Sequence, residues 1–149
     1  MALSKNMIQI KNIGGIAYEE REAGEALIYP GMLCRVDSDG NVCKANAEGG
    51  KVEVLVAIED SLQGKTVDDA YTLGNPVRLV RFRPGEEFHV RQHGHTSITE
   101  GEQLVSKGDG TARSASDSGS YGDTAFAVAL ETQDLSDEDS DELLHCRVL

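Results

Sequence analysis

Hydrophobic and polar residues alternate with a period of two along most of this sequence, the pattern of partly buried β-strands. One face of residues 51–60 (KVEVLVAIED) carries the aliphatic residues Val52, Val54, Val56 and Ile58. Leu55 and Ala57 lie on the other face. Because both faces are apolar, we expect this strand to be covered on both sides.

Three other segments have strand character. In residues 124–131 (TAFAVALE), large residues on one face alternate with alanines on the other, which suits a strand that another layer approaches closely. Residues 77–90 predict two strands around Pro84-Gly85, and residues 143–149 a last strand. Residues 19–26 (EEREAGEA) contain helix formers but no apolar stripe, so little helix is expected. The fold class is therefore all-β, a small barrel or sandwich.

A hairpin pattern occurs twice. Residues 31–45 (GMLCRVDSDGNVCKA) and 101–115 (GEQLVSKGDGTARSA) both start with Gly, carry Asp-Gly at the ninth and tenth positions and end with Ala. Asp-Gly favours tight hairpin turns. A long apolar strand follows each hairpin, so the sequence predicts two related modules, residues 26–60 and 96–132. The alternative is that a β-protein simply reuses common hairpin residues.

Two segments lie outside these modules. Residues 1–18 are predicted to form an N-terminal arm, and residues 19–149 a single domain. The arm carries four isoleucines that can contact another molecule, Ile8, Ile10, Ile13 and Ile16. Its alternative is an ordinary first strand of the same barrel.

Residues 134–142 (DLSDEDSDE) hold six acids and predict a solvated loop. A calcium site at Asp137, Asp139 and Asp141 is the alternative, although the Gly and Glu of a calcium-binding loop are missing from it.

The net charge of −12 argues against a nucleic-acid partner, because such binding depends on clustered Lys and Arg. No apolar run reaches the ~18 residues of a membrane helix, and the N-terminus lacks a signal-peptide core, so we expect no membrane contact and synthesis in a cytoplasm. The three cysteines are then expected to be free thiols. A two-residue turn at Asp39-Gly40 would place Val36 opposite Cys43 and keep a Cys34–Cys43 disulfide open as the alternative.

The strongest candidate for chemistry is residues 89–100 (HVRQHGHTSITE). His93 and His95, followed by Glu100, match the start of a cupin metal site. A cupin needs a second motif with another His, and the only later one, His145, lacks the accompanying Gly and Pro. No nucleophile elbow or phosphate-binding loop is present. We therefore predict a protein that is not an enzyme and has no cofactor, with a cupin-like metal enzyme as the alternative.

Four segments taken together resemble the head decoration (capsid cement) proteins of tailed double-stranded DNA phages. They are EEREAGEALIYPGMLCRVDSDGNV, YTLGNPVRLVRFRPGEEFHVR, ITEGEQLVSKGDGTARSA and AFAVALET, in this order and spacing between residues 19 and 132. The His-rich HVRQHGHT and the acidic residues 134–142 depart from the family pattern.

The resemblance implies a small β-barrel or β-tulip body that assembles as a trimer. Such proteins bind the outer surface of an expanded capsid at three-fold and quasi-three-fold positions, where they join neighbouring subunits of the major capsid protein. On this basis the protein would belong to the virion, and Ile8, Ile10, Ile13 and Ile16 would form its capsid interface.

Overall fold

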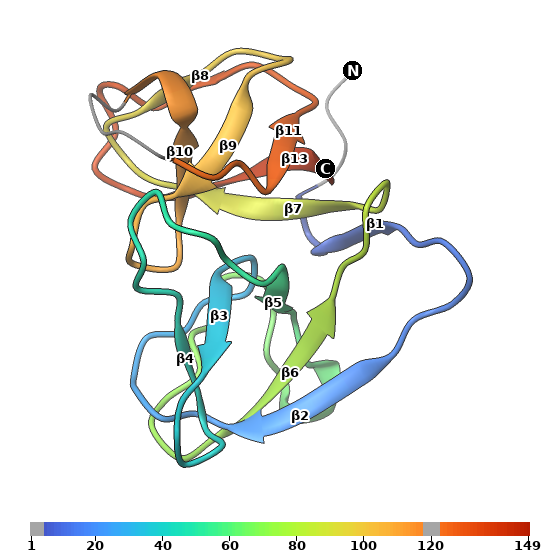
Figure 1. Ribbon diagram of the computed structural model, residues 1–149. Coiled ribbons are helices and arrows are strands. Elements are labelled where there is room, and N and C mark those ends of the chain that lie inside the picture. The colour runs from blue at the N-terminus through green and yellow to red at the C-terminus, as the bar shows by residue number, and fades with distance from the viewer. Residues whose placement is uncertain (1–4, 118–122) are drawn as a thin grey trace.

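The computed structural model describes residues 5–117 and 123–149, and these residues form an all-β protein. The predicted fold class is therefore confirmed. The only helical segments among the described residues are two 3₁₀ turns, η1 (Ser61–Gln63) and η2 (Ala115–Asp117). No helix in these residues is long and apolar enough to cross a membrane. Figure 1 shows two barrel-like groups of strands, one above the other.

The N-terminal barrel is a five-stranded sheet in the order β2-β6-β5-β3-β4. A parallel bridge between Ala23 and Val42 joins the chain after β2 to β4 and closes the ring. Its strands are β2 (Tyr18–Glu22), β3 (Leu33–Val36), β4 (Val42–Lys44), β5 (Leu55–Ala57) and β6 (Pro76–Arg81).

The C-terminal barrel closes in the same way, in the order β7-β13-β11-β9-β10 with a parallel pair between Ala112 of β10 and Gln92 of β7. Its strands are β7 (Glu87–Gln92), β9 (Gln103–Ser106), β10 (Ala112–Ser114), β11 (Ala127–Ala129) and β13 (Glu142–Val148). A ribbon of β8 (Ser97–Ile98) and β12 (Gln133–Asp134) lies beside it. Strand β1 (Gln9–Lys11) adds to the edge of β7.

The two barrels have the same strand register. Strands β3 and β4 correspond to β9 and β10, so the pair Val36–Val42 becomes Ser106–Ala112. Strand β5 corresponds to β11 in the same way, and the pair Cys34–Leu55 becomes Leu104–Ala127. The closing pair Ala23–Val42 becomes Gln92–Ala112. The correspondence reaches beyond residues 26–60 and 96–132, because β2 matches β7 and β6 matches β13. The division into an arm, residues 1–18, and a single domain stays a prediction.

The predicted two-residue turn at Asp39-Gly40 is wrong by one position. The Asp37 Oδ1 accepts hydrogen bonds from the backbone N–H groups of Asp39 and Asn41, both at 2.9 Å, and Gly40 has φ +83°. This longer turn places Cys43 opposite Arg35 and not opposite Val36. Because neighbouring strand positions face opposite sides of a sheet, the change separates Cys34 from Cys43.

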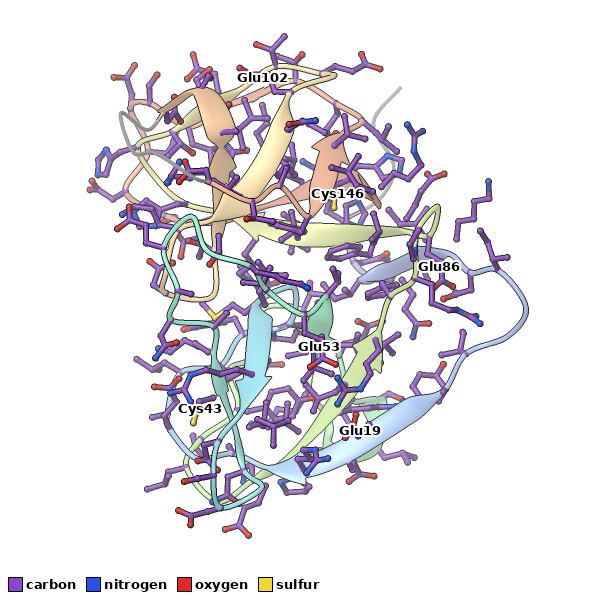
Figure 2. All side chains as sticks on the ribbon, in the orientation of Figure 1. Glu19, Cys43, Glu53, Glu86, Glu102 and Cys146 are labelled. Carbon is purple, nitrogen blue, oxygen red and sulfur yellow. The ribbon has the colours of Figure 1, made fainter. Side chains whose placement is uncertain are left out.

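All three cysteines are buried free thiols, as the sequence predicts. Burial raises the pKa of Cys34 to about 12 and also raises that of Cys146. Cys34 lies in the core of the N-terminal barrel, and Cys146 lies in the larger core that includes the C-terminal barrel. Figure 2 labels Cys43 and Cys146, which lie in different barrels.

Strand β5 is covered on both sides, as its two apolar faces predict. Leu55 and Ala57 belong to the core inside the N-terminal barrel. Val56 and Ile58 belong to a second core that continues into the C-terminal barrel. Between the barrels, Phe82 stacks on Phe88 with ring centroids 4.5 Å apart. The two barrels therefore share one apolar core.

Among the described residues, the two barrels differ in their outer rows, and that of the N-terminal barrel is apolar. Leu33, Val56 and Val80 lie side by side in neighbouring strands, are buried, and belong to the core that the two barrels share. The corresponding residues of the C-terminal barrel are Gln103, Val128 and Arg147, of which the first and last are exposed. Such a polar row does not favour docking of another apolar layer.

Candidate functional site

The N-terminal arm follows the edge of its own barrel and is not free. Strand β1 pairs with β7 in an antiparallel manner, and Ile8 accepts a hydrogen bond from the His89 backbone N–H at 2.8 Å. The Ile8 side chain is fully buried in the shared core. It therefore faces its own chain and not a partner, unlike the role expected for it. Residues 1–4 of the predicted arm lie outside the described residues.

The other arm isoleucines lie in or beside the loop that joins β1 to β2, residues 12–17, which we call the arm loop. Ile10 is partly buried, whereas Ile13 and Ile16 are 50% and 41% exposed. Gly14 and Gly15 between them have φ values of +77° and +94°, a conformation that other residues adopt only with strain. The glycines thus turn the chain so that two apolar side chains face solvent, which marks this loop as the candidate interaction site.

Glu86 and Arg83 anchor the arm loop to the turn between β6 and β7. The buried Glu86 accepts hydrogen bonds from the backbone N–H of Ile13 at 2.9 Å and of Arg83 at 2.6 Å. The Arg83 guanidinium donates to the carbonyl oxygens of Ile13 and Gly15. In Figure 2, Glu86 lies where this turn approaches the start of the loop. Burial opposes ionisation of Glu86, but these hydrogen bonds and the Arg83 charge outweigh it and lower its pKa.

Replacing Glu86 with glutamine is expected to weaken the anchor by about 1–3 kcal/mol, because the amide leaves a buried N–H donor without an acceptor. Since the pKa of Glu86 is lowered on folding, its contribution is complete above its ordinary pKa of about 4.5. It is lost as the pH falls through the lower folded value. The variant should therefore show faster amide exchange at Ile13 and a smaller loss of stability in acid.

The matched control for this experiment is Glu53→Gln. Glu53 pairs with Arg81 but its side chain is 58% exposed, so its replacement should change stability by less than about 0.5 kcal/mol. An unchanged exchange rate at Ile13 in the Glu86 variant would contradict the anchoring role.

A pocket of about 510 Å³ separates the arm loop from the N-terminal barrel. Its lining includes Gly15 and Ile16 on one side and Val80, Arg81 and Arg83 on the other. Arg81 also bonds to Glu19 and Glu53, two side chains labelled in Figure 2. The pocket combines apolar walls with guanidinium groups, so it can receive a side chain or short segment of another protein.

The structure does not bring the predicted cupin residues together. His93 Nδ1 lies 3.2 Å from an Asp109 oxygen, whereas His95 Nε2 lies 2.9 Å from Asp139. Glu100 is in an exposed turn, where its backbone N–H bonds to the Thr132 hydroxyl. Within residues 5–117 and 123–149, no group of three or more His, Cys, Asp or Glu side chains is arranged to hold a metal ion.

The acidic residues 134–142 pack against the segment that contains His93 and His95. The Asp141 Oδ1 accepts a hydrogen bond from the Gly94 N–H at 2.8 Å, and the His95 N–H donates to the carbonyl oxygens of Leu135 and Glu138. His145 lies elsewhere, on β13, with Nε2 2.8 Å from Glu87. The two segments that depart from the decoration-protein pattern therefore pack against each other.

Comparison with known proteins gives a match at the level of the fold. No protein-family model matches the sequence, and no curated protein sequence matches it. A phage structure has this fold. The head fiber gp8.5 N base of bacteriophage phi29 superimposes with a TM-score of 0.58 and 14% sequence identity, over 91% of this chain and 95% of that chain. At this identity the likeness establishes the fold alone.

The alignment with the phi29 protein covers too much of this chain to involve one barrel only. Both barrels are therefore part of the likeness. The isoleucines of the arm loop can be identified from the sequence as candidate contact residues, but the residues that anchor the loop cannot. Arg83 and Glu86 are distant from Ile13 in the sequence, and no local pattern connects them.

Proposed function

We propose that this chain is a structural protein of a phage head, which binds the outer surface of the expanded capsid and joins neighbouring subunits of the major capsid protein, as a trimer at three-fold and quasi-three-fold positions. The observation that carries this proposal is the fold likeness to a phage head fiber protein over most of both chains. The resemblance of residues 19–132 to capsid cement proteins points the same way.

The arm loop supplies the contact in this proposal. Ile13 and Ile16 present apolar surface from a loop that Glu86 and Arg83 hold in place, so little conformational entropy is lost on binding. Stabilisation of the capsid is then a matter of mass action, because a protein that binds only the assembled, expanded shell favours that state. Many copies, each bound at several points, multiply the effect. No catalytic step and no cofactor is involved.

The test is cosedimentation with purified heads of the phage that encodes this chain, in expanded and unexpanded forms. The wild-type protein should bind expanded heads only, at a stoichiometry of three copies per three-fold position. The double variant Ile13→Ser/Ile16→Ser should bind roughly 10–100-fold more weakly, because two buried apolar contacts are lost.

The control variant is Leu149→Ser, which removes an apolar side chain that is 51% exposed on the C-terminal barrel. It should bind heads as the wild type does. Equal binding by the double variant and the wild type would remove the arm loop from the interface. Absence of any wild-type binding would reject the capsid role itself.

A further inference from the structure

Strand β2 has an open edge. The Ala23 N–H donates to Asn75, beside β6, and the Gly24 N–H donates to Val42 in the opposite direction. Because successive backbone groups of a strand alternate in direction, the N–H groups of Glu20 and Glu22 also point away from β6. These residues are exposed, and their outward N–H groups have no hydrogen-bond partner among the described residues. We call the outward side of Glu20 and Glu22 the open edge.

The corresponding edge of the C-terminal barrel is fully paired. In the repeat, Glu20, Glu22 and Gly24 correspond to His89, Arg91 and His93. The His89 N–H donates to Ile8 at 2.8 Å, the Arg91 N–H to Gly31 at 2.9 Å and the His93 N–H to Ala112 at 3.0 Å. Of these three bonds, only that of His93 has a counterpart in the N-terminal barrel, from Gly24 to Val42. The edge is therefore covered on β7 of the C-terminal barrel and left uncovered on β2 of the N-terminal barrel.

The strand that covers β7 shows which chemistry suits such an edge. Strand β1 and the residue before it are apolar at Ile8 and Ile10 and basic at Lys11, whose Nζ lies 4.0 Å from Glu87. The open edge is more acidic than the edge of β7 that β1 covers, since β2 contains Glu19, Glu20 and Glu22. Tyr18 and the 93% exposed Leu62 lie beside it and line a small pocket with Arg78. An incoming strand with Lys or Arg and apolar side chains meets complementary groups here.

A second copy of this chain is a poor occupant by the same reasoning. Within one chain, Gly31 of the N-terminal barrel accepts a hydrogen bond from β7. In a second copy the corresponding residue that could approach β2 is Gly101, which is flanked by Glu100 and Glu102. These carboxylates would face the glutamates of β2, and each chain carries a net charge of −12. Like charges at a sheet edge oppose pairing.

We propose that the open edge of β2 receives an extended, basic segment of the capsid shell protein, which adds to the N-terminal barrel as an antiparallel strand in the way that β1 adds to β7. This proposal rests on the proposed capsid role. It extends the contact surface from the arm loop directly into β2, which begins at Tyr18, shortly after Ile16.

The test compares Glu20→Pro with Glu20→Ala in head binding. Both variants remove the carboxylate, but only proline removes the outward N–H and obstructs strand addition. Since the backbone groups of Glu20 do not bond to β6, both variants should fold, which circular dichroism and thermal unfolding of the free proteins check. We expect Glu20→Pro to bind heads roughly tenfold or more weakly than Glu20→Ala. Amide exchange at Glu20 and Glu22 should slow on binding of the wild type to heads.

The outcomes separate this proposal from the one on which it rests. If the wild type binds heads but both variants bind alike, or if the Glu20 and Glu22 amides exchange equally fast in the bound state, strand addition is wrong and the capsid role stands. If the free protein already protects these amides in a concentration-dependent manner, a second copy is the occupant and the proposal is overturned. If the wild type does not bind heads, both proposals fail.

Discussion

Replacing Phe88 with alanine is expected to lower the free energy of unfolding by about 3–5 kcal/mol, the usual cost of removing a buried aromatic ring. Phe88 is fully buried in the core that the two barrels share. Its ring stacks on Phe82 with centroids 4.5 Å apart and an angle of 8° between the planes. Phe82 follows β6 of the N-terminal barrel and Phe88 belongs to β7 of the C-terminal barrel, so the cavity would open at the junction.

Chemical denaturation monitored by circular dichroism measures this loss, with Phe88→Leu as the comparison. Leucine keeps most of the apolar volume but removes the ring stack, so its cost should be about 1–2 kcal/mol. The barrels share a core, so each variant should unfold in a single cooperative transition. A loss of less than about 1 kcal/mol for Phe88→Ala would mean that the junction tolerates the cavity and that the barrels are held together by other contacts.

The local elements of this fold follow from the sequence, and the contacts between distant segments do not. Alternation of side chains and the Asp-Gly turns predicted the hairpins of both barrels. The repeated hairpin patterns, which begin at Gly31 and Gly101, have the same separation as the corresponding strand pairs Val36–Val42 and Ser106–Ala112. The turn register failed by one position because the Asp37 side chain binds two backbone N–H groups, an interaction that the alternation pattern does not contain.

The arm shows the limit of sequence reasoning for the candidate site. Its isoleucines have a strand-like pattern but no partner nearby, because the partner strand β7 lies in the second half of the chain, where Phe88 pairs with Gln9. The pattern therefore cannot distinguish Ile8, which fills the core, from Ile13 and Ile16, which face solvent. Deletion of residues 1–16 would remove a core residue together with the exposed ones. Point substitutions in the arm loop test the interface without this loss of stability.

The junction between the barrels should also be sensitive to a single methyl group at Gly31. Gly31 has φ +92°, and its carbonyl oxygen accepts the Arg91 N–H of the other barrel at 2.9 Å. A Cβ at this position would lie 2.7 Å from the Leu143 Cδ2 and 3.2 Å from the His89 carbonyl oxygen. We expect Gly31→Ala to cost about 2–5 kcal/mol, the sum of backbone strain at positive φ and overpacking against the C-terminal barrel.

The repeat supplies a matched control in Gly101, which occupies the place of Gly31 in the second hairpin pattern. Gly101 has φ +94° and donates to Ala129 as Gly31 donates to Ala57, but a Cβ there would meet no atom within 4 Å. Gly101→Ala should therefore cost only the backbone strain, about 1–2 kcal/mol. The difference between the two variants, measured by denaturant unfolding, isolates the packing of one barrel against the other. Equal losses would show that packing at Gly31 contributes little to holding the two barrels together.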